Sequence, residues 1–221
     1  MVYAFPVVRV TISGTAATGA EEWSTGFFVG AESAGASNPT QQFADAIKSA
    51  WQTFFTSATT GVSNTVTSNQ VKLSQLGTDG KTIPEDTIFS TWATPINGTL
   101  TTTLFPPQIT LAATLASSLP RGLGAKGRMY LPGICHPLIS GGIISTTNQT
   151  NIGTNLATFF NAVNTAAPVG SRVILASEGH KKTNTGALNK NVTSVKVGNV
   201  YDTQRRRRNG IRETYTTANL A

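Results

Sequence analysis

The sequence predicts an α+β fold in which two helices accompany a mainly antiparallel β-sheet. Threonine is about one residue in six, and its β-branched side chain fits a strand better than a helix. Two stretches instead repeat apolar residues at i, i+4, i+7, i+8 and i+11, which is typical of a helix that lies on a core. Short segments of alternating apolar and polar residues predict roughly nine strands around these helices.

Two strands, a helix and two further strands are expected in the first half of the chain. Residues 8–12 alternate with a period of two, and residues 23–30 form a second strand. The helix is expected to begin after Asn38, a favourable capping residue. Residues 71–74 and 87–92 are the strands that follow. The apolar stripe of this helix consists of Phe43, Ile47, Ala50, Trp51 and Phe54.

The second half repeats this order about a hundred residues later. Residues 109–115 and 127–133 are expected strands, and a helix is expected to begin near Asn151. Residues 173–176 and 193–197 are the strands after it. The apolar stripe of the second helix consists of Ile152, Leu156, Phe159, Phe160 and Val163.

We therefore predict a duplicated β-β-α-β-β unit, the alternative being a chain in which strands and helices alternate without a common origin. The first repeat covers residues 1–104, the second covers residues 105–204 of the same compact domain, and residues 205–221 form a basic C-terminal segment. Both helices are expected on one face of a single sheet or of two abutting sheets, which leaves the other face wet. A jelly roll in which the helices are loop insertions is the competing architecture.

Positive charge is concentrated in the second half. Residues 1–120 carry four basic and seven acidic side chains, a net charge of −3, whereas residues 121–221 carry thirteen and three, a net charge of +10. Five of these basic residues form the Arg cluster, which consists of Arg205, Arg206, Arg207, Arg208 and Arg212. A strongly polarised charge of this kind predicts contact with nucleic acid on one side of the molecule.

The Arg cluster suits phosphate better than bases. Adjacent guanidinium groups repel one another, so they are stable in water or against a polyanion, and each can bind a phosphate through two hydrogen bonds. Only Tyr201 and Tyr215 lie nearby to stack on bases, which favours contact that is independent of base sequence. A solvated tail or a signal for nuclear import is the alternative.

A glycine-rich loop precedes the expected strand at 127–133. Its glycines, Gly122, Gly124 and Gly127, have the spacing of a dinucleotide-binding loop. That site requires a helix after the loop and an acidic residue about twenty positions later. A strand is expected here instead, and no acidic residue lies between Asp86 and Glu178. The sequence therefore argues against a Rossmann site.

The basic residues around this loop, Arg121, Lys126 and Arg128, are candidates for contact with phosphate or with another subunit. The corresponding loop of the first repeat carries Glu21 and Glu22. If the acidic loop of one copy meets the basic loop of the next, the contact is heterologous and closes into rings or shells. Separate solvated charges are the alternative.

The sequence offers no constellation typical of an enzyme. Its two histidines, His136 and His180, lie outside nucleophile-elbow and zinc-protease patterns, and Cys135 is the only cysteine. A closed metal site would need carboxylates, which are scarce in this half of the chain. We therefore expect no enzymatic activity, no metal and no cofactor.

In overall character the chain resembles the coat and virion structural proteins of small viruses and phages. The resemblance rests on a small β-rich chain with only 12% charged residues, no catalytic set and the Arg cluster. It implies a homo-oligomer of many copies that packages viral RNA or single-stranded DNA, located in the virion and, during assembly, in the host cytoplasm.

No membrane partner is expected, because the N-terminus lacks a signal-peptide pattern and no apolar run approaches the ~18 residues that cross a bilayer. Two other classes fit the same features. One is a nucleic-acid-binding protein that does not assemble, and the other is a phage tail or connector subunit that forms a ring.

Overall fold

The computed structural model describes residues 7–16, 22–31, 40–58, 66–75, 86–91, 108–112, 126–130, 146–174, 192–198 and 216–221. The first half contains β1 (Val7–Ala16), β2 (Glu22–Ala31), α1 (Gln41–Ala58), β3 (Val66–Gln75) and β4 (Asp86–Thr91). The second half contains β5 (Gln108–Ala112), β6 (Lys126–Tyr130), α2 (Thr146–Ala166), β7 (Ser171–Ile174), β8 (Ser194–Gly198) and β9 (Thr216–Asn219).

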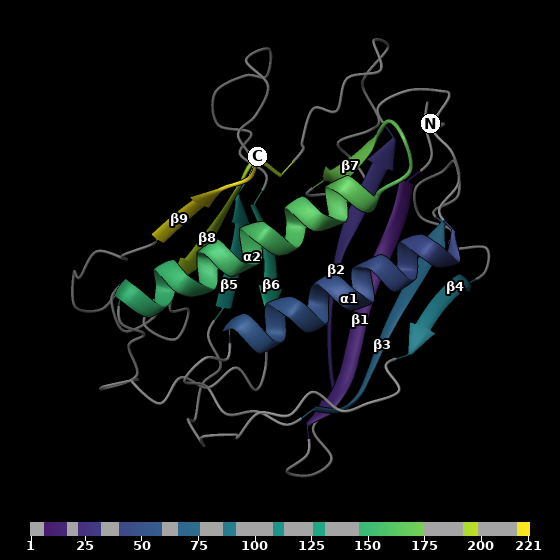
Figure 1. Ribbon diagram of the computed structural model, residues 1–221, viewed down its shortest axis with the longest axis horizontal. Helices are drawn as coiled ribbons and strands as arrows, with labels where there is room; N and C mark the ends of the chain where they lie inside the picture. Colours follow the sequence, from purple (N-terminus) through teal and green to yellow (C-terminus); the bar gives the residue numbers. More distant parts are fainter. Residues whose placement is uncertain are drawn as a thin grey trace.

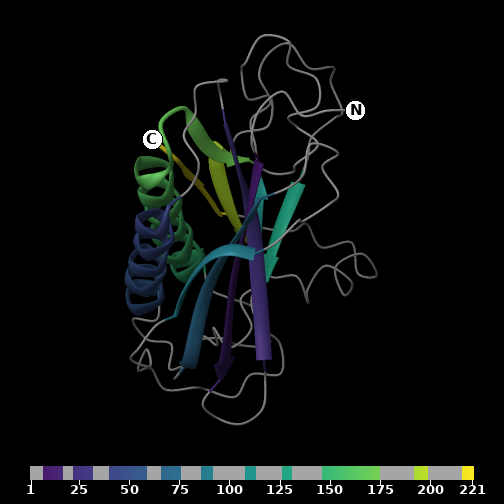
Figure 2. The same ribbon diagram turned by 90° about the vertical axis from the view of Figure 1, so that its right-hand side faces the viewer.

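The strands form two antiparallel sheets with the helices on one side. The first sheet has the order β4-β3-β1-β2-β7 and the second the order β6-β5-β8-β9. β2 also contacts β6, so the two sheets abut. Both helices lie on the same side of the strands (Figure 2), and they run antiparallel to each other (Figure 1). The predicted α+β fold, with antiparallel sheet and two helices, is confirmed.

The core lies between the helices and this face of the sheets. Both apolar stripes face it, with only Ala50 partly exposed among their ten residues. Val8, Val10 and Ile12 of β1 enter it from the first sheet, and Val195 of β8 enters it from the second. Because the helices supply much of this main core, they are not loop insertions of a jelly roll.

The helix ends differ from the sequence expectation. α1 is capped by Thr40 rather than Asn38, since the Thr40 hydroxyl accepts a hydrogen bond from the Phe43 backbone N–H at 3.4 Å. α2 begins at Thr146 rather than near Asn151. Its first turn is polar, so apolar periodicity could not detect that turn.

A tight turn after α2 leads into β7. The Ser171 N–H donates to the Pro168 carbonyl at 2.9 Å, and Gly170 has a φ of 76°. A positive φ at the third position of a turn is readily adopted by glycine. The turn directs β7 to β2 in the first sheet.

β7 is therefore not the counterpart of β3, which corrects the strand correspondence expected from the sequence. β3 pairs with β1, whereas β8 makes the equivalent pairing with β5. β9 then pairs with β8 as β4 pairs with β3. The orders β2-β1-β3-β4 and β6-β5-β8-β9 match when read in this way.

Candidate nucleic-acid interface

Most of the predicted contact residues lie outside the described part of the chain. This holds for the Arg cluster and for Arg121 and Glu21. Glu22 is the first residue of β2, and Lys126 and Arg128 belong to β6. The glycine-rich loop leads into strand β6, as expected, and not into a helix.

The Arg cluster lies in the connection between two paired strands. Residues 199–215 join β8, which ends at Gly198, to β9, which begins at Thr216. β9 pairs with β8, and the Ala221 N–H donates to Asn161 Oδ1 of α2 at 3.1 Å. Residues 216–219 of the expected basic C-terminal segment therefore form strand β9, and the Arg cluster falls between β8 and β9 in the sequence.

The side of the second sheet that faces away from the helices collects basic positions. Val195 is buried beneath the helices, and its partner across the ladder is Leu111. Because successive residues of a strand alternate between faces, the neighbouring row belongs to the opposite face. That row consists of Arg128, Thr110 and Lys196.

Lys126 is two positions from Arg128 on β6 and shares its face. Among the described positions of this sheet that face away from the helices, none is acidic. Lys196 lies two residues before the end of β8, roughly 7 Å along the strand. β8 thus ends, at Gly198, next to this basic row.

The first sheet carries cations on the same side. On β1, Arg9 is exposed and Thr11 and Ser13 are partly exposed, whereas their neighbours point into the core. Lys72 of β3 lies directly opposite Thr11, and exposed Arg172 of β7 lies opposite Gly30. Three strands therefore contribute one cation each.

Two acidic positions accompany these cations. Asp86 lies opposite Ser74, where the β3–β4 ladder shifts its register. Glu22 lies opposite Thr15, at the far end of the β1–β2 ladder from Arg9. Across both sheets, the described strand positions on this side number six basic (Arg9, Lys72, Lys126, Arg128, Arg172 and Lys196) against two acidic (Glu22 and Asp86).

The side of the sheets that carries the helices has almost no charge. α2 contains no charged residue, and α1 contains only Asp45 and Lys48. The Lys48 Nζ lies 3.9 Å from Asp45 Oδ1, so these two charges offset each other. The described helices therefore present a neutral surface, while the helix-free side of the sheets is basic.

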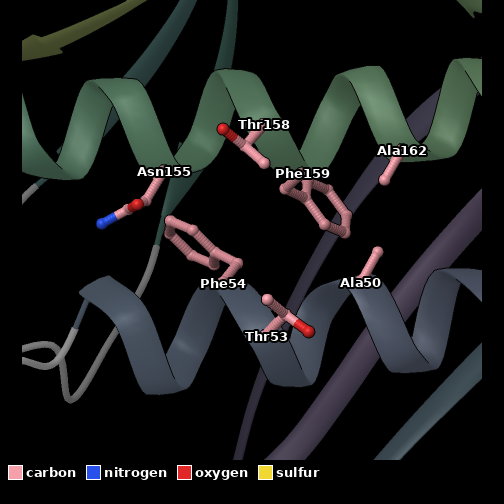
Figure 3. A pocket seen from close by; sticks show the side chains of 7 residues that line it. All are labelled: Ala50, Thr53, Phe54, Asn155, Thr158, Phe159 and Ala162. Carbon is pink, nitrogen blue, oxygen red and sulfur yellow. The ribbon is translucent and has the colours of Figure 1, made fainter.

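A small hollow opens between the two helices (Figure 3). Its volume is about 110 Å³. Buried Phe54 and Phe159 form its floor, with ring centroids 6.1 Å apart, and exposed Thr53 and Thr158 stand at its rim. Ligand pockets usually occupy about 300–1,000 Å³ and carry a few convergent polar groups. This hollow is smaller than that range, and none of the residues that line it is charged.

The described residues contain no group of three or more His, Cys, Asp or Glu side chains that could hold a metal ion. None of the helices within them is long and apolar enough to span a bilayer. Cys135, His136 and His180 lie outside the described residues.

Sequence reasoning named Lys126 and Arg128 but missed four members of the basic side. Arg9, Lys72, Arg172 and Lys196 are isolated cations on separate strands, so no local pattern marks them. The alternation of β1 does indicate that Arg9 faces away from the core. Only the strand pairing shows that the others share its side.

Comparison with family models, with curated proteins and with solved structures finds no match for this chain.

Proposed function

We propose that this protein is a viral or phage coat protein that assembles in many copies and contacts its packaged RNA or single-stranded DNA through sequence-independent binding of phosphates. The observation that carries the proposal is the separation of charge between the two sides of the fold. The basic positions of the second sheet lie in the row opposite the neutral helices, and the Arg cluster follows β8 in the sequence.

Phosphate binding follows from the types of residue involved. Lys126 and Arg128 are positions of β6 and Lys196 is a position of β8, and these two strands flank β5 and so lie about 10 Å apart. The Arg cluster extends this set with guanidinium groups that remain protonated at any physiological pH. Such contacts fix a nucleic acid on the surface without reading its sequence.

An internal duplication would supply the repeated surfaces of an assembling subunit. The matching orders β2-β1-β3-β4 and β6-β5-β8-β9 support a duplicated β-β-α-β-β unit, with β7 as an addition between α2 and β8. The core stripes of α1 and α2 keep identical spacing. The low proportion of charged residues, 12%, reduces the repulsion between copies that pack together.

Sedimentation velocity of the purified protein, together with absorbance at 260 and 280 nm, tests the proposal. Large particles that contain nucleic acid are expected. Small rings of uniform mass would instead indicate a connector subunit. A monomer or dimer that binds nucleic acid without forming particles would overturn the coat function and leave a simple binding protein.

A further inference from the structure

The helix-free face of the first sheet contains an aromatic ring beside a cation. Phe28 of β2 lies directly opposite Arg9 of β1 in the ladder, and Phe28 is only partly buried. On its other side Phe28 pairs with Ile174, and the ring packs against the small buried cluster of Val7 and Ile174. The Phe28 ring thus packs at its side against two buried neighbours on the same face of the sheet and is itself partly exposed.

Polar groups continue along this face from the aromatic ring. Thr11 and Ser13 follow Arg9 on β1, and Gln70 and Lys72 lie across from them on β3. Opposite Thr11 on β2 stands Gly26, which has no side chain to rise above the sheet. The face is therefore flat around Gly26, and it carries cations, hydrogen-bonding side chains and the ring of Phe28.

This combination matches a single-stranded nucleic acid. Cations bind its phosphates, and an aromatic ring can stack on any unpaired base. In a duplex the bases are paired and stacked inside, so Phe28 could contribute little, and the face would offer only its cations. Glu22 lies at the far end of β2 from Phe28. Asp86, on the outer strand β4, lies in the row of Arg9, two strands from it, and three strands from Phe28.

We propose that this face, formed by Arg9, Phe28, Lys72 and Arg172, is a second nucleic-acid surface that binds single strands, so that the sheets face the packaged genome and the neutral helices face outward. It rests on the proposed contact of the protein with nucleic acid. It adds a binding surface on the first sheet made of residues outside the Arg cluster, and it states which side of the subunit faces the genome.

Fluorescence anisotropy with full-length protein tests this surface. The probes are a 20-nucleotide RNA, a single-stranded DNA of the same sequence and the corresponding DNA duplex, each titrated at several salt concentrations. Arg9→Gln is compared with Lys48→Gln, since both remove one positive charge but from opposite sides of the fold.

For Arg9→Gln, the slope of log affinity against log salt should become shallower by about 0.7 for the single strands, because one phosphate contact is lost. Lys48→Gln should leave the slope unchanged. Phe28→Leu, which keeps apolar contact with Val7 and Ile174, should weaken single-strand binding about 5- to 150-fold at unchanged slope, as the loss of one stacked base predicts.

Equal slopes for Arg9→Gln and Lys48→Gln would overturn the inference, as would duplex binding as tight as single-strand binding. A thermal melt of each variant separates loss of contact from loss of fold, and Arg172→Gln provides an independent test should Phe28→Leu unfold. A shallower slope in Arg9→Gln alongside absent particles would overturn only the coat function. Particles that form normally while the slope is unaffected would overturn only this surface.

Discussion

The indole of Trp51 on α1 packs edge to face against the ring of Phe159 on α2, with centroids 5.3 Å apart and ring planes inclined by 74°. Phe159 also meets Phe27 of β2 edge to face, with centroids 6.0 Å apart. One side chain thus joins both helices to the first sheet. The arrangement is expected to be the main link between the two halves of the chain.

Phe159→Ala should lower the free energy of unfolding by about 3–5 kcal/mol, because it removes buried area and leaves a cavity among rings that cannot collapse into it. Thr154→Ala, at an exposed position of the same helix, should change stability by less than about 0.5 kcal/mol. Urea denaturation followed by circular dichroism measures both. A similar small loss in the two variants would show that the aromatic cluster does not hold the halves together.

Asn164→Ala should destabilise the fold by about 1–3 kcal/mol. The Asn164 Oδ1 accepts a hydrogen bond from the Val173 N–H at 2.9 Å, and Val173 is fully buried, so the substitution leaves a buried donor without an acceptor. Asn161→Ala is the matched control. It removes an exposed bond from the Ala221 N–H and should cost less than about 1 kcal/mol. The prediction fails if the control costs as much as Asn164→Ala in the same urea titration.

Gly26→Ala should destabilise the first sheet by about 1–3 kcal/mol. A Cβ at this position would lie 2.8 Å from the Val10 carbonyl oxygen, a backbone atom held by the β1–β2 ladder. Ser13→Ala, on the same face of the same pair of strands, should be nearly neutral. Melting temperatures of the two variants compare them, and an unchanged value for Gly26→Ala would show that the ladder can shift.

Replacement of Arg205–Arg208 by alanine should flatten the salt dependence of nucleic-acid binding. Five phosphate contacts from the Arg cluster contribute about −3.5 to the log–log slope for a single strand, and the loss of four of them should make the slope shallower by about 3. Replacement of the same four residues by lysine keeps the charge and should keep the slope. Anisotropy titrations with single-stranded DNA measure the three proteins. If the alanine variant matches the natural chain, the cluster serves another purpose.

The helices show which features a local sequence pattern can predict. The stripes from Phe43 to Phe54 and from Ile152 to Val163 enter the core as expected, because a period of about 3.6 places such residues on one side of a helix wherever the helix lies. Apolar periodicity did not predict the polar first turn of α2 or the cap at Thr40. Capping depends on one hydrogen bond, which several nearby polar residues could make.

The strands show that a local sequence pattern does not determine which strands pair. β7 follows α2 in the chain as β3 follows α1, yet β7 pairs with β2 in the other half. Nothing in residues 171–174 distinguishes these two partners, because every strand edge offers the same backbone groups. β9 is short and was not identified as a strand from the sequence, and its pairing with β8 shows that the Arg cluster lies in a connection between strands.

The sequence by itself determined the class of fold, the inward faces of both helices and of β1, and the excess of positive charge in the second half, because each of these depends on composition or on short-range periodicity. Only the tertiary structure decided that Arg9, Lys72, Arg172 and the positions of Lys126, Arg128 and Lys196 share one side, opposite a neutral pair of helices. These residues come from five strands, and strand pairing between distant segments sets their arrangement.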